Sequence, residues 1–223
     1  MGSVAENIIN LKAELPEGVE LVAVSKFHPA EMIAEAYEAG QRKFGESRVQ
    51  ELLKKIQELP DDIEWHFIGH LQTNKVRQLM GKTALIESVD TEHLLDYIDK
   101  ESERAGVITR VLMQIHVAQE ETKFGFSPDE LLDYFRAHRY RNLKATHICG
   151  IMGMASNTDD ADRVRSDFAR IAEVYNTVRN EFSEEIRGFD ILSMGMSGDW
   201  TIAVEEGSNL IRVGSRIFGE RQY

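Results

Sequence analysis

Leu21-Val22-Ala23-Val24-Ser25-Lys26 is a short apolar stretch that ends in a lysine and is followed by Phe27-His28-Pro29. Its length, its valines and the closing proline predict a buried strand that ends at a turn. Because side chains alternate along a strand, Lys26 lies on the same face as Val22 and Val24, at the mouth of an apolar core. Burial lowers the pKa of an amine and makes it a nucleophile suited to Schiff-base chemistry. For this lysine alone, a strand-end charge that reaches into solvent is the alternative.

Short apolar stretches alternate with longer amphipathic ones along the whole chain of 223 residues. The apolar stretches predict strands at residues 20–25, 43–45, 64–68, 83–88, 109–117, 144–151, 189–193 and 209–213. The amphipathic stretches predict an opening helix at 4–14, before the first strand, and later helices near 30–39, 46–58, 73–80, 91–105, 128–137, 159–182 and 199–206. This alternation predicts an α/β fold with a parallel sheet, and eight strands are the number that closes a (β/α)8 TIM barrel.

The organisation of the chain predicts a single domain over residues 1–223. No low-complexity segment or linker rich in Pro, Gly or Ser divides it, and only four prolines occur. An open, doubly wound sheet is the alternative, but no G-x-G-x-x-G follows the first strand and no Walker sequence is present. In a barrel the active site lies at the carboxyl ends of the strands, which is where Lys26 stands.

The composition argues against several classes of partner. A formal net charge of -12 argues against broad binding to nucleic acid or to an anionic membrane. No apolar stretch approaches the ~18 residues that span a bilayer, and residues 1–10 carry no basic region of a secretory signal. Cys149 is the only cysteine, and the sequence contains no H-E-x-x-H. We therefore expect a cytoplasmic protein without nucleic-acid, membrane or metal partners.

Two loops near the end of the chain are candidates for binding a phosphate. Strand 189–193 runs into Met194-Gly195-Met196-Ser197-Gly198-Asp199, and strand 209–213 runs into Gly214-Ser215-Arg216. Glycine lets the backbone approach a ligand, and the N-terminus of a following helix presents N–H groups. Phosphate sites of (β/α)8 enzymes frequently use these last two loops. Taken singly, each loop could instead be a helix cap with turn glycines.

Arg212 is the candidate cation of this site. It shares strand parity with Leu210, whereas Ile211 and Val213 face the other way. If Ile211 and Val213 pack on helices, Arg212 points into the barrel, where a buried guanidinium needs an acceptor. A structural salt bridge would satisfy it. A lysine, an arginine and a phosphate cradle on one face together favour a planar phosphorylated cofactor.

Ordered blocks of sequence over nearly the whole chain carry a resemblance to a known family. They are residues 21–26 with Pro29, Phe44-Gly45-Glu46 with Arg48-Val49-Gln50-Glu51, Trp65-His66-Phe67-Ile68-Gly69 with Leu71-Gln72-Thr73-Asn74-Lys75, Lys123-Phe124-Gly125-Phe126, Gly150-Ile151-Met152, and residues 192–199 and 212–219. On these blocks the chain resembles the widespread pyridoxal 5′-phosphate (PLP) homeostasis proteins, the YggS/PROSC group. The resemblance implies the barrel fold of the N-terminal domain of alanine racemase (PLP fold type III), with PLP held as an internal aldimine.

The resemblance also implies roles for single residues. Lys26 is the Schiff-base lysine, covalently linked to PLP, and Ser197, Gly214 and Ser215 hold the phosphate together with neighbouring backbone amides. Arg212 falls where an arginine approaches the pyridine nitrogen.

Two further positions bear on the cofactor pocket. Met196 stands with other methionines at strand ends, where they line an apolar pocket or fill gaps, and we include it among the cofactor-binding residues. Ser47 departs from the family, in which many members have Asn, so no side-chain contact to the cofactor is carried over to this position.

These features favour binding and delivery over catalysis. A cation beside the pyridine nitrogen disfavours its protonation and weakens the ring as an electron sink. The related racemases need a second base, a tyrosine from an additional β domain, for which a barrel over residues 20–219 leaves no room. The resemblance implies control of free PLP and of the balance of amino and keto acids, with apo-enzymes as recipients, and we expect a monomer.

Two other functions remain open. One is a PLP enzyme that acts on amino acids, such as a racemase or a dehydratase. The other is a cofactor-free aldolase that uses Lys26 on a sugar phosphate, since the same barrel and phosphate loops would serve it.

Overall fold

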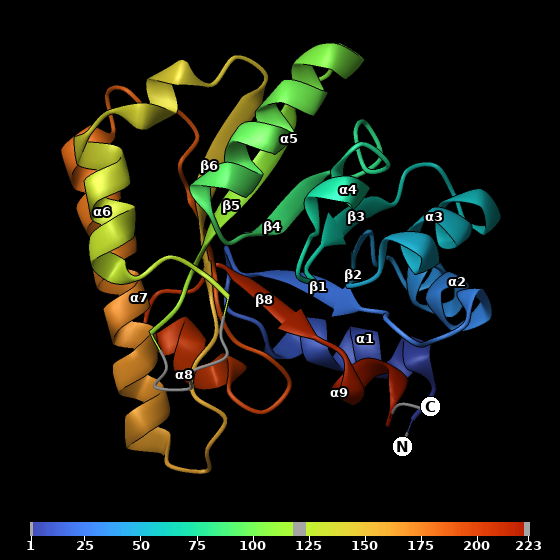
Figure 1. The fold of residues 1–223 in the computed structure, drawn as a ribbon. Helices are drawn as coiled ribbons and strands as arrows, with labels where there is room; N and C mark the ends of the chain where they lie inside the picture. Colours follow the sequence, from blue (N-terminus) through green and yellow to red (C-terminus); the bar gives the residue numbers. More distant parts are fainter. Residues whose placement is uncertain (1, 118–123, 221–223) are drawn as a thin grey trace.

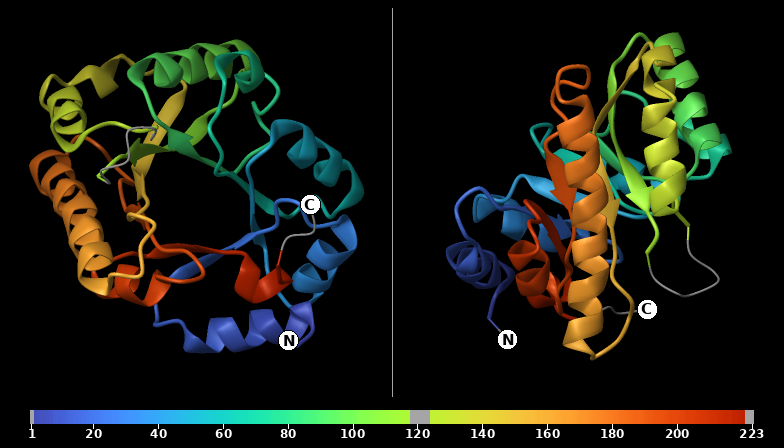
Figure 2. Two further views of the ribbon diagram at one scale, coloured as in Figure 1. Left: turned by 60° about the horizontal axis from the view of Figure 1, so that its bottom comes forward. Right: turned by 90° about the vertical axis from the view of Figure 1, so that its left-hand side faces the viewer.

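The computed structural model describes residues 2–117 and 124–220, and its strands form a closed barrel. The eight strands are parallel and pair in sequence order, and β1 (Glu20–Val24) pairs with β8 (Leu210–Val213) to close the sheet. Figure 1 shows the strands converging at the centre of the molecule, and the left view of Figure 2 shows the helices around them. The expected (β/α)8 TIM barrel is thus confirmed, and closure excludes the open sheet.

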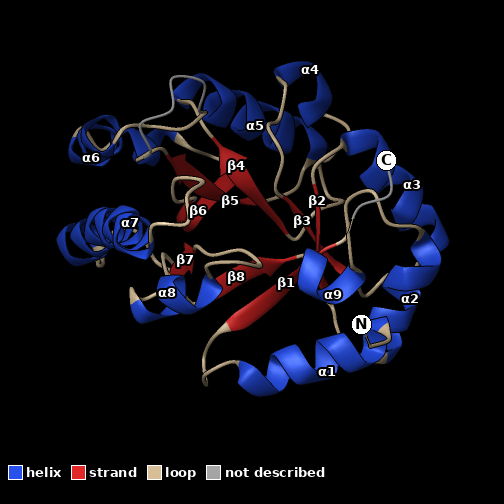
Figure 3. Cartoon of the chain, turned by 90° about the horizontal axis from the view of Figure 1, so that it is seen from below, coloured by secondary structure: helices blue, strands red, loops and turns tan. Residues whose placement is uncertain are grey.

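Each strand is followed by a helix on the outside of the barrel, as Figure 3 shows from below. The other strands are β2 (Lys43–Glu46), β3 (Glu64–Phe67), β4 (Leu85–Val89), β5 (Thr109–Ile115), β6 (Thr146–Gly153) and β7 (Ile191–Ser193). The helices are α1 (Val4–Glu14), α2 (Ala30–Glu38), α3 (Val49–Glu58), α4 (Thr73–Val76), α5 (Glu92–Ala105), α6 (Pro128–Arg136), α7 (Ala161–Phe182), α8 (Trp200–Glu205) and α9 (Ser215–Phe218), with a 3-10 turn η1 (Arg139–Asn142) before β6.

Local sequence signals explain where several helices begin. Ser3 caps α1 and Ser127 caps α6, each in a capping box with the glutamate three residues later. The expected opening helix is therefore confirmed as α1. It packs beside α2 and α9, and the Asn7 amide donates to the carbonyl of Ile217 at 2.9 Å. Among the described residues, no helix combines the length and the apolar character needed to cross a membrane.

Some predicted boundaries are wrong. The predicted helix 73–80 ends at Val76, because the following turns use i to i−3 hydrogen bonds such as Leu79 N to Val76 O. The predicted helix 46–58 begins only at Val49, because Glu46 still belongs to β2. The predicted strand 144–151 shifts to Thr146–Gly153, where its last residues pair with β5. The helical segment expected after Gly214 is the short helix α9, whereas the 3-10 turn η1 was not predicted.

Alternation along the strands separates two apolar layers. Val22, Leu85, Leu112, Cys149, Met152 and Leu210 form a cluster inside the barrel. Residues of the opposite parity, such as Ala23, Ile211 and Val213, join the larger core between the sheet and the helices. The expectation that Ile211 and Val213 pack outward is confirmed, and it directs Arg212 into the barrel.

Candidate functional site

A cavity of about 530 Å³ opens at the carboxyl ends of the strands. It is lined by Val24, Lys26, Ile68, Met152, Met154, Met196, Ser197, Gly198, Arg212, Gly214, Ser215 and Glu220. All the residues predicted from the sequence for the cofactor site lie in this lining: Lys26, Met196, Ser197, Arg212, Gly214 and Ser215. Ser47 lies outside it, and Lys123, which belongs to one of the family blocks, lies outside the described residues.

Lys26 reaches this cavity from the end of β1, in line with Val22 and Val24. Val22 is fully buried inside the barrel, and Val24 lines the cavity beside Lys26. Lys26 itself is partly exposed. The alternation expected from the sequence is therefore confirmed: the strand delivers the lysine to the inner face of the barrel rather than to the outer surface.

The two loops predicted to bind phosphate meet in the lining of this cavity. The Ser197 hydroxyl accepts a hydrogen bond from the Gly214 N–H at 3.2 Å, so the loop after β7 is joined to the loop after β8. Gly195 has a φ of +91°, and a Cβ there would lie 2.7 Å from that of Ala203, so only glycine allows this path of the chain. The Asp199 carboxylate accepts from the Met196 N–H at 2.5 Å and fixes the turn between them.

Arg212 lies at the inner wall of the cavity and is almost fully buried, with 4% of its surface exposed. Its guanidinium donates to the Ser193 hydroxyl at 2.5 Å and to the Gly153 carbonyl at 3.0 Å. Ser193 in turn donates to the Glu87 carboxylate at 2.6 Å. The salt bridge considered from the sequence is thus present at longer range, with 3.8 Å between the guanidinium and Glu87.

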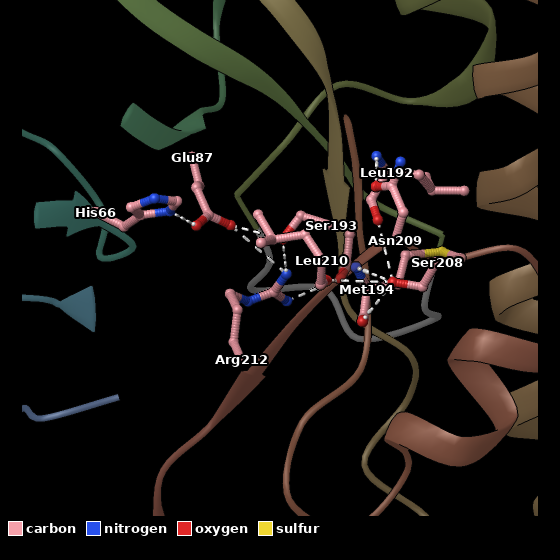
Figure 4. Close-up of polar contacts among 10 residues, drawn as sticks. His66, Glu87, Leu192, Ser193, Met194, Ser208, Asn209, Leu210 and Arg212 are labelled. Carbon is pink, nitrogen blue, oxygen red and sulfur yellow. Dashed lines mark hydrogen bonds and ion pairs between the residues drawn. The ribbon is translucent and has the colours of Figure 1, made fainter. Parts of the chain in front are cut away.

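Figure 4 shows this chain of contacts continuing from Glu87 to His66. His66 Nδ1 lies 2.6 Å from Glu87 Oε1, and both side chains are buried. Burial raises the pKa of the Glu87 carboxyl, but the hydrogen bond from His66 and the charges of His66 and Arg212 outweigh burial and hold this pKa below its ordinary value. Burial also lowers the pKa of Arg212, although Glu87 and Asp199 oppose it. The interior therefore holds an anionic carboxylate against the arginine of the cavity.

Glu87 was not among the predicted site residues, although the sequence held a signal for it. It lies two residues after Leu85 in β4, so it shares the inward parity of an apolar residue inside the barrel. A charge at such a position needs a buried partner. The partner, Arg212, is 125 residues away, so only the barrel topology brings the two together.

Glu46, at the end of β2, faces the helix side of the sheet. Its Oε1 accepts from Lys55 at 2.7 Å and from the Ser25 hydroxyl at 2.5 Å, whereas its buried Oε2 has no hydrogen-bond partner among the described residues. Burial raises the pKa of Glu46 to about 7, against the opposing effect of the Lys55 ammonium. A proton on Oε2 therefore belongs to the folded state up to about neutral pH.

This raised pKa predicts that the free energy of unfolding decreases as pH rises. Between about pH 4.5 and about pH 7 the folded protein keeps a proton on Glu46 that the unfolded chain releases, so this contribution is lost as pH passes through about 7. The loss is on the order of 2–3 kcal/mol between about pH 5 and about pH 8. Urea unfolding at both pH values should show that the free energy of unfolding decreases more between them in the wild type than in Glu46→Gln. An identical pH dependence in both proteins would contradict it.

Comparison with known proteins places this barrel in a defined class. The family model described as "Alanine racemase, N-terminal domain" matches residues 1–222. The alanine racemase of E. faecalis, 21% identical, superposes with a TM-score of 0.74 over 98% of this chain and 58% of its own, which shows a shared fold. The fold and the cavity thus define a barrel of the alanine racemase type.

Two curated relatives and one solved structure narrow the class. The chain is 40% identical to the pyridoxal phosphate homeostasis protein of Aquifex aeolicus, over 92% of this chain and 88% of that protein. It is 39% identical to the protein of the same name from Schizosaccharomyces pombe, over 91% and 84%. PipY of Synechococcus elongatus, solved with PLP bound, is 36% identical with a TM-score of 0.88 over 97% of this chain and all of its own. The chain belongs to the pyridoxal phosphate homeostasis protein family.

Proposed function

We propose that this protein binds PLP at the mouth of the barrel, holds it on Lys26 as a Schiff base and acts in PLP homeostasis. The observation that carries the proposal is the single cavity that gathers the Lys26 amine, the Ser197–Gly214 junction with Ser215, and the buried Arg212. The PLP-bound structure of PipY supports the choice of ligand. In this function the protein buffers a reactive aldehyde and delivers it to apo-enzymes, which influences the balance of amino and keto acids.

The residues in the cavity fit the three parts of this cofactor. The hydroxyls of Ser197 and Ser215 and the backbone at Gly214 suit a phosphate group. The apolar side chains of Val24, Ile68, Met152, Met154 and Met196 suit the faces of a flat ring. When bound, PLP would supply an aldehyde carbon, with which the Lys26 amine would form a C=N bond while the carbonyl oxygen leaves as water.

The electrostatics of the cavity favour a carrier over a catalyst. Arg212 would lie against the ring nitrogen, as the family resemblance implies, and a cation there disfavours protonation of that nitrogen. A neutral ring withdraws electrons weakly from a bound amino acid, so the bond to its α-proton stays strong. We further propose, as expected from the sequence, that the protein acts as a monomer in the cytoplasm.

Titration of the purified protein with PLP tests this function. We expect an absorbance band of the protonated Schiff base, and borohydride followed by mass spectrometry should place the reduced adduct on the peptide that contains Lys26. The loaded protein should then restore activity to an apo-enzyme that depends on PLP. A colourless protein, or an adduct on other lysines only, would contradict the proposal. Exchange of the α-proton of an amino acid in D₂O would favour an enzyme instead.

Ser197→Ala is expected to weaken the binding of PLP but not that of pyridoxal, which lacks the phosphate. The hydroxyl both meets the Gly214 N–H and faces the cavity, so its loss removes one hydrogen bond to a charged group, which lowers the affinity for PLP by about tenfold. Fluorescence titration with the two ligands measures the difference. Equal losses of affinity for PLP and pyridoxal would show that Ser197 does not act through the phosphate.

A further inference from the structure

The backbone on both sides of Lys26 is held from the helix side of the barrel, away from the cofactor cavity. The Ser25 carbonyl accepts from Lys55 Nζ at 2.9 Å, and the Ser25 hydroxyl donates to Glu46 at 2.5 Å. On the other side, the Phe27 N–H donates to Glu51 Oε1 at 2.6 Å. Three hydrogen bonds therefore fix the residues immediately before and after the proposed Schiff-base lysine.

The groups that make these contacts are bound to one another. Lys55 Nζ lies 2.7 Å from Glu46 Oε1 and 2.7 Å from Glu51 Oε1, so its third proton goes to the Ser25 carbonyl. The side chains of Lys55 and Glu46 are 5% and 0% exposed. A buried ammonium group whose three protons all have acceptors is held in one position. It therefore also fixes the position of the Ser25 carbonyl that it binds.

The held segment contains a strained residue. Phe27 has a φ of +67°, a left-handed conformation that costs a residue other than glycine about 1–3 kcal/mol. Such a conformation persists only where the surroundings impose it. Here the carboxylate of Glu51 holds the Phe27 N–H, and the guanidinium of Arg48 lies 4.6 Å from the centre of the Phe27 ring. The turn also brings the His28 N–H to the Ser25 carbonyl at 3.1 Å.

None of these three ionisable side chains reaches the cofactor cavity. Glu46, Glu51 and Lys55 are absent from its lining, whereas Glu51 and Lys55 line a separate cavity on the outer side together with Phe27. They cannot contact a ligand of the barrel mouth. Their influence on it must pass through the backbone of residues 25–27.

We infer that Glu46, Glu51 and Lys55 form a positioning cluster that holds the chain around Lys26 and directs its amine into the cofactor cavity. The inference rests on the proposed function of Lys26 and adds to it a cause for the geometry of the lysine. By fixing Ser25 and Phe27, the cluster presents the amine of the residue between them at a defined place. The cluster should therefore affect formation of the C=N bond and leave recognition of the phosphate and the ring unchanged.

The test compares PLP with pyridoxine 5′-phosphate, an alcohol that occupies the same site and cannot form a Schiff base. Glu51→Ala removes the acceptor of the Phe27 N–H and leaves Lys55 paired with Glu46. We expect the affinity for PLP to fall about tenfold, as for loss of a hydrogen bond to a charged group, and that for pyridoxine 5′-phosphate to change less than about twofold. Glu51→Gln keeps an oxygen acceptor and should restore most of the affinity for PLP.

Glu58→Ala is the matched control, because Glu58 lies on the same helix, lines the same outer cavity and pairs with the exposed Lys54 rather than with residues 25–27. It should bind both ligands like the wild type. Unchanged binding of PLP by Glu51→Ala, or equal losses of affinity for both ligands, would overturn the inference. The proposed function would remain valid as long as the wild-type protein forms the Schiff base. If Glu51→Ala does not fold, Ser25→Ala serves in the same comparison. A wild type without a Schiff base would refute the proposed function itself.

Discussion

Lys26→Ala is expected to abolish the Schiff-base absorbance completely while the protein still binds PLP. The strand brings Lys26 to the cavity beside Val24, and the phosphate loops and Arg212 stand on other strands, so their contacts do not depend on this side chain. The affinity for PLP should fall to that for pyridoxine 5′-phosphate, because only the covalent bond is lost. Absorbance spectra and equilibrium dialysis with both ligands measure the two effects separately.

Lys54→Ala is the control for this experiment. Lys54 lies on α3 close to the segment that holds Lys26, but its side chain is 74% exposed and points to Glu58. Its removal should leave the spectrum unchanged. A band that persists in Lys26→Ala would show that another lysine carries the aldehyde, and the proposed role of Lys26 would then be wrong.

The sequence sufficed to predict Lys26, Ser197, Gly214 and their neighbours in the cavity lining because these residues follow the strands. In a parallel barrel the carboxyl ends of all the strands lie on one face, so Lys26 after β1, Ser197 after β7 and Gly214 after β8 had to meet there. Alternation along each strand then predicts which side chains point into the barrel, and along β8 it predicts that Arg212 does. Neither step required knowledge of how helices pack on the outside of the sheet.

The residues behind the cavity could not be found in this way. Glu51 and Lys55 show the i, i+4 spacing of an ordinary exposed pair on a helix, and only the packing of α3 against the end of β1 buries Lys55. Likewise, the left-handed conformation of Phe27 has no sequence signal, because glycine or asparagine is the residue usual at such a φ. Tertiary packing determines which side chains bind the backbone of another element, and the local sequence does not show it.

These supporting groups give Lys26 and Arg212 different kinds of environment. The lysine is held through the backbone of its neighbours Ser25 and Phe27, by groups that do not line the cavity. The arginine is held through its side chain, by Ser193 and Glu87 inside the barrel. A substitution in the first set should therefore change covalent attachment, whereas one in the second set should change the charge of the cavity and the stability of the fold.

Glu87→Leu is expected to destabilise the protein by about 3–5 kcal/mol, because it removes the buried carboxylate that balances the charge of the buried Arg212 guanidinium. This is a large part of the roughly 5–15 kcal/mol that stabilises a typical domain. The double variant Glu87→Leu with Arg212→Met removes both charges, so it should recover much of the loss. Urea unfolding at neutral pH measures the three proteins.

The pH dependence gives an independent check on Glu87. Its pKa is lowered in the folded protein, so its contribution to stability is present above the pKa of the unfolded chain and is lost as pH falls through the folded value. The gap between wild type and Glu87→Leu should therefore narrow in acid, the opposite sense to the effect of Glu46. A single variant as stable as the wild type, or a double variant less stable than the single one, would show that Glu87 does not compensate the charge of Arg212.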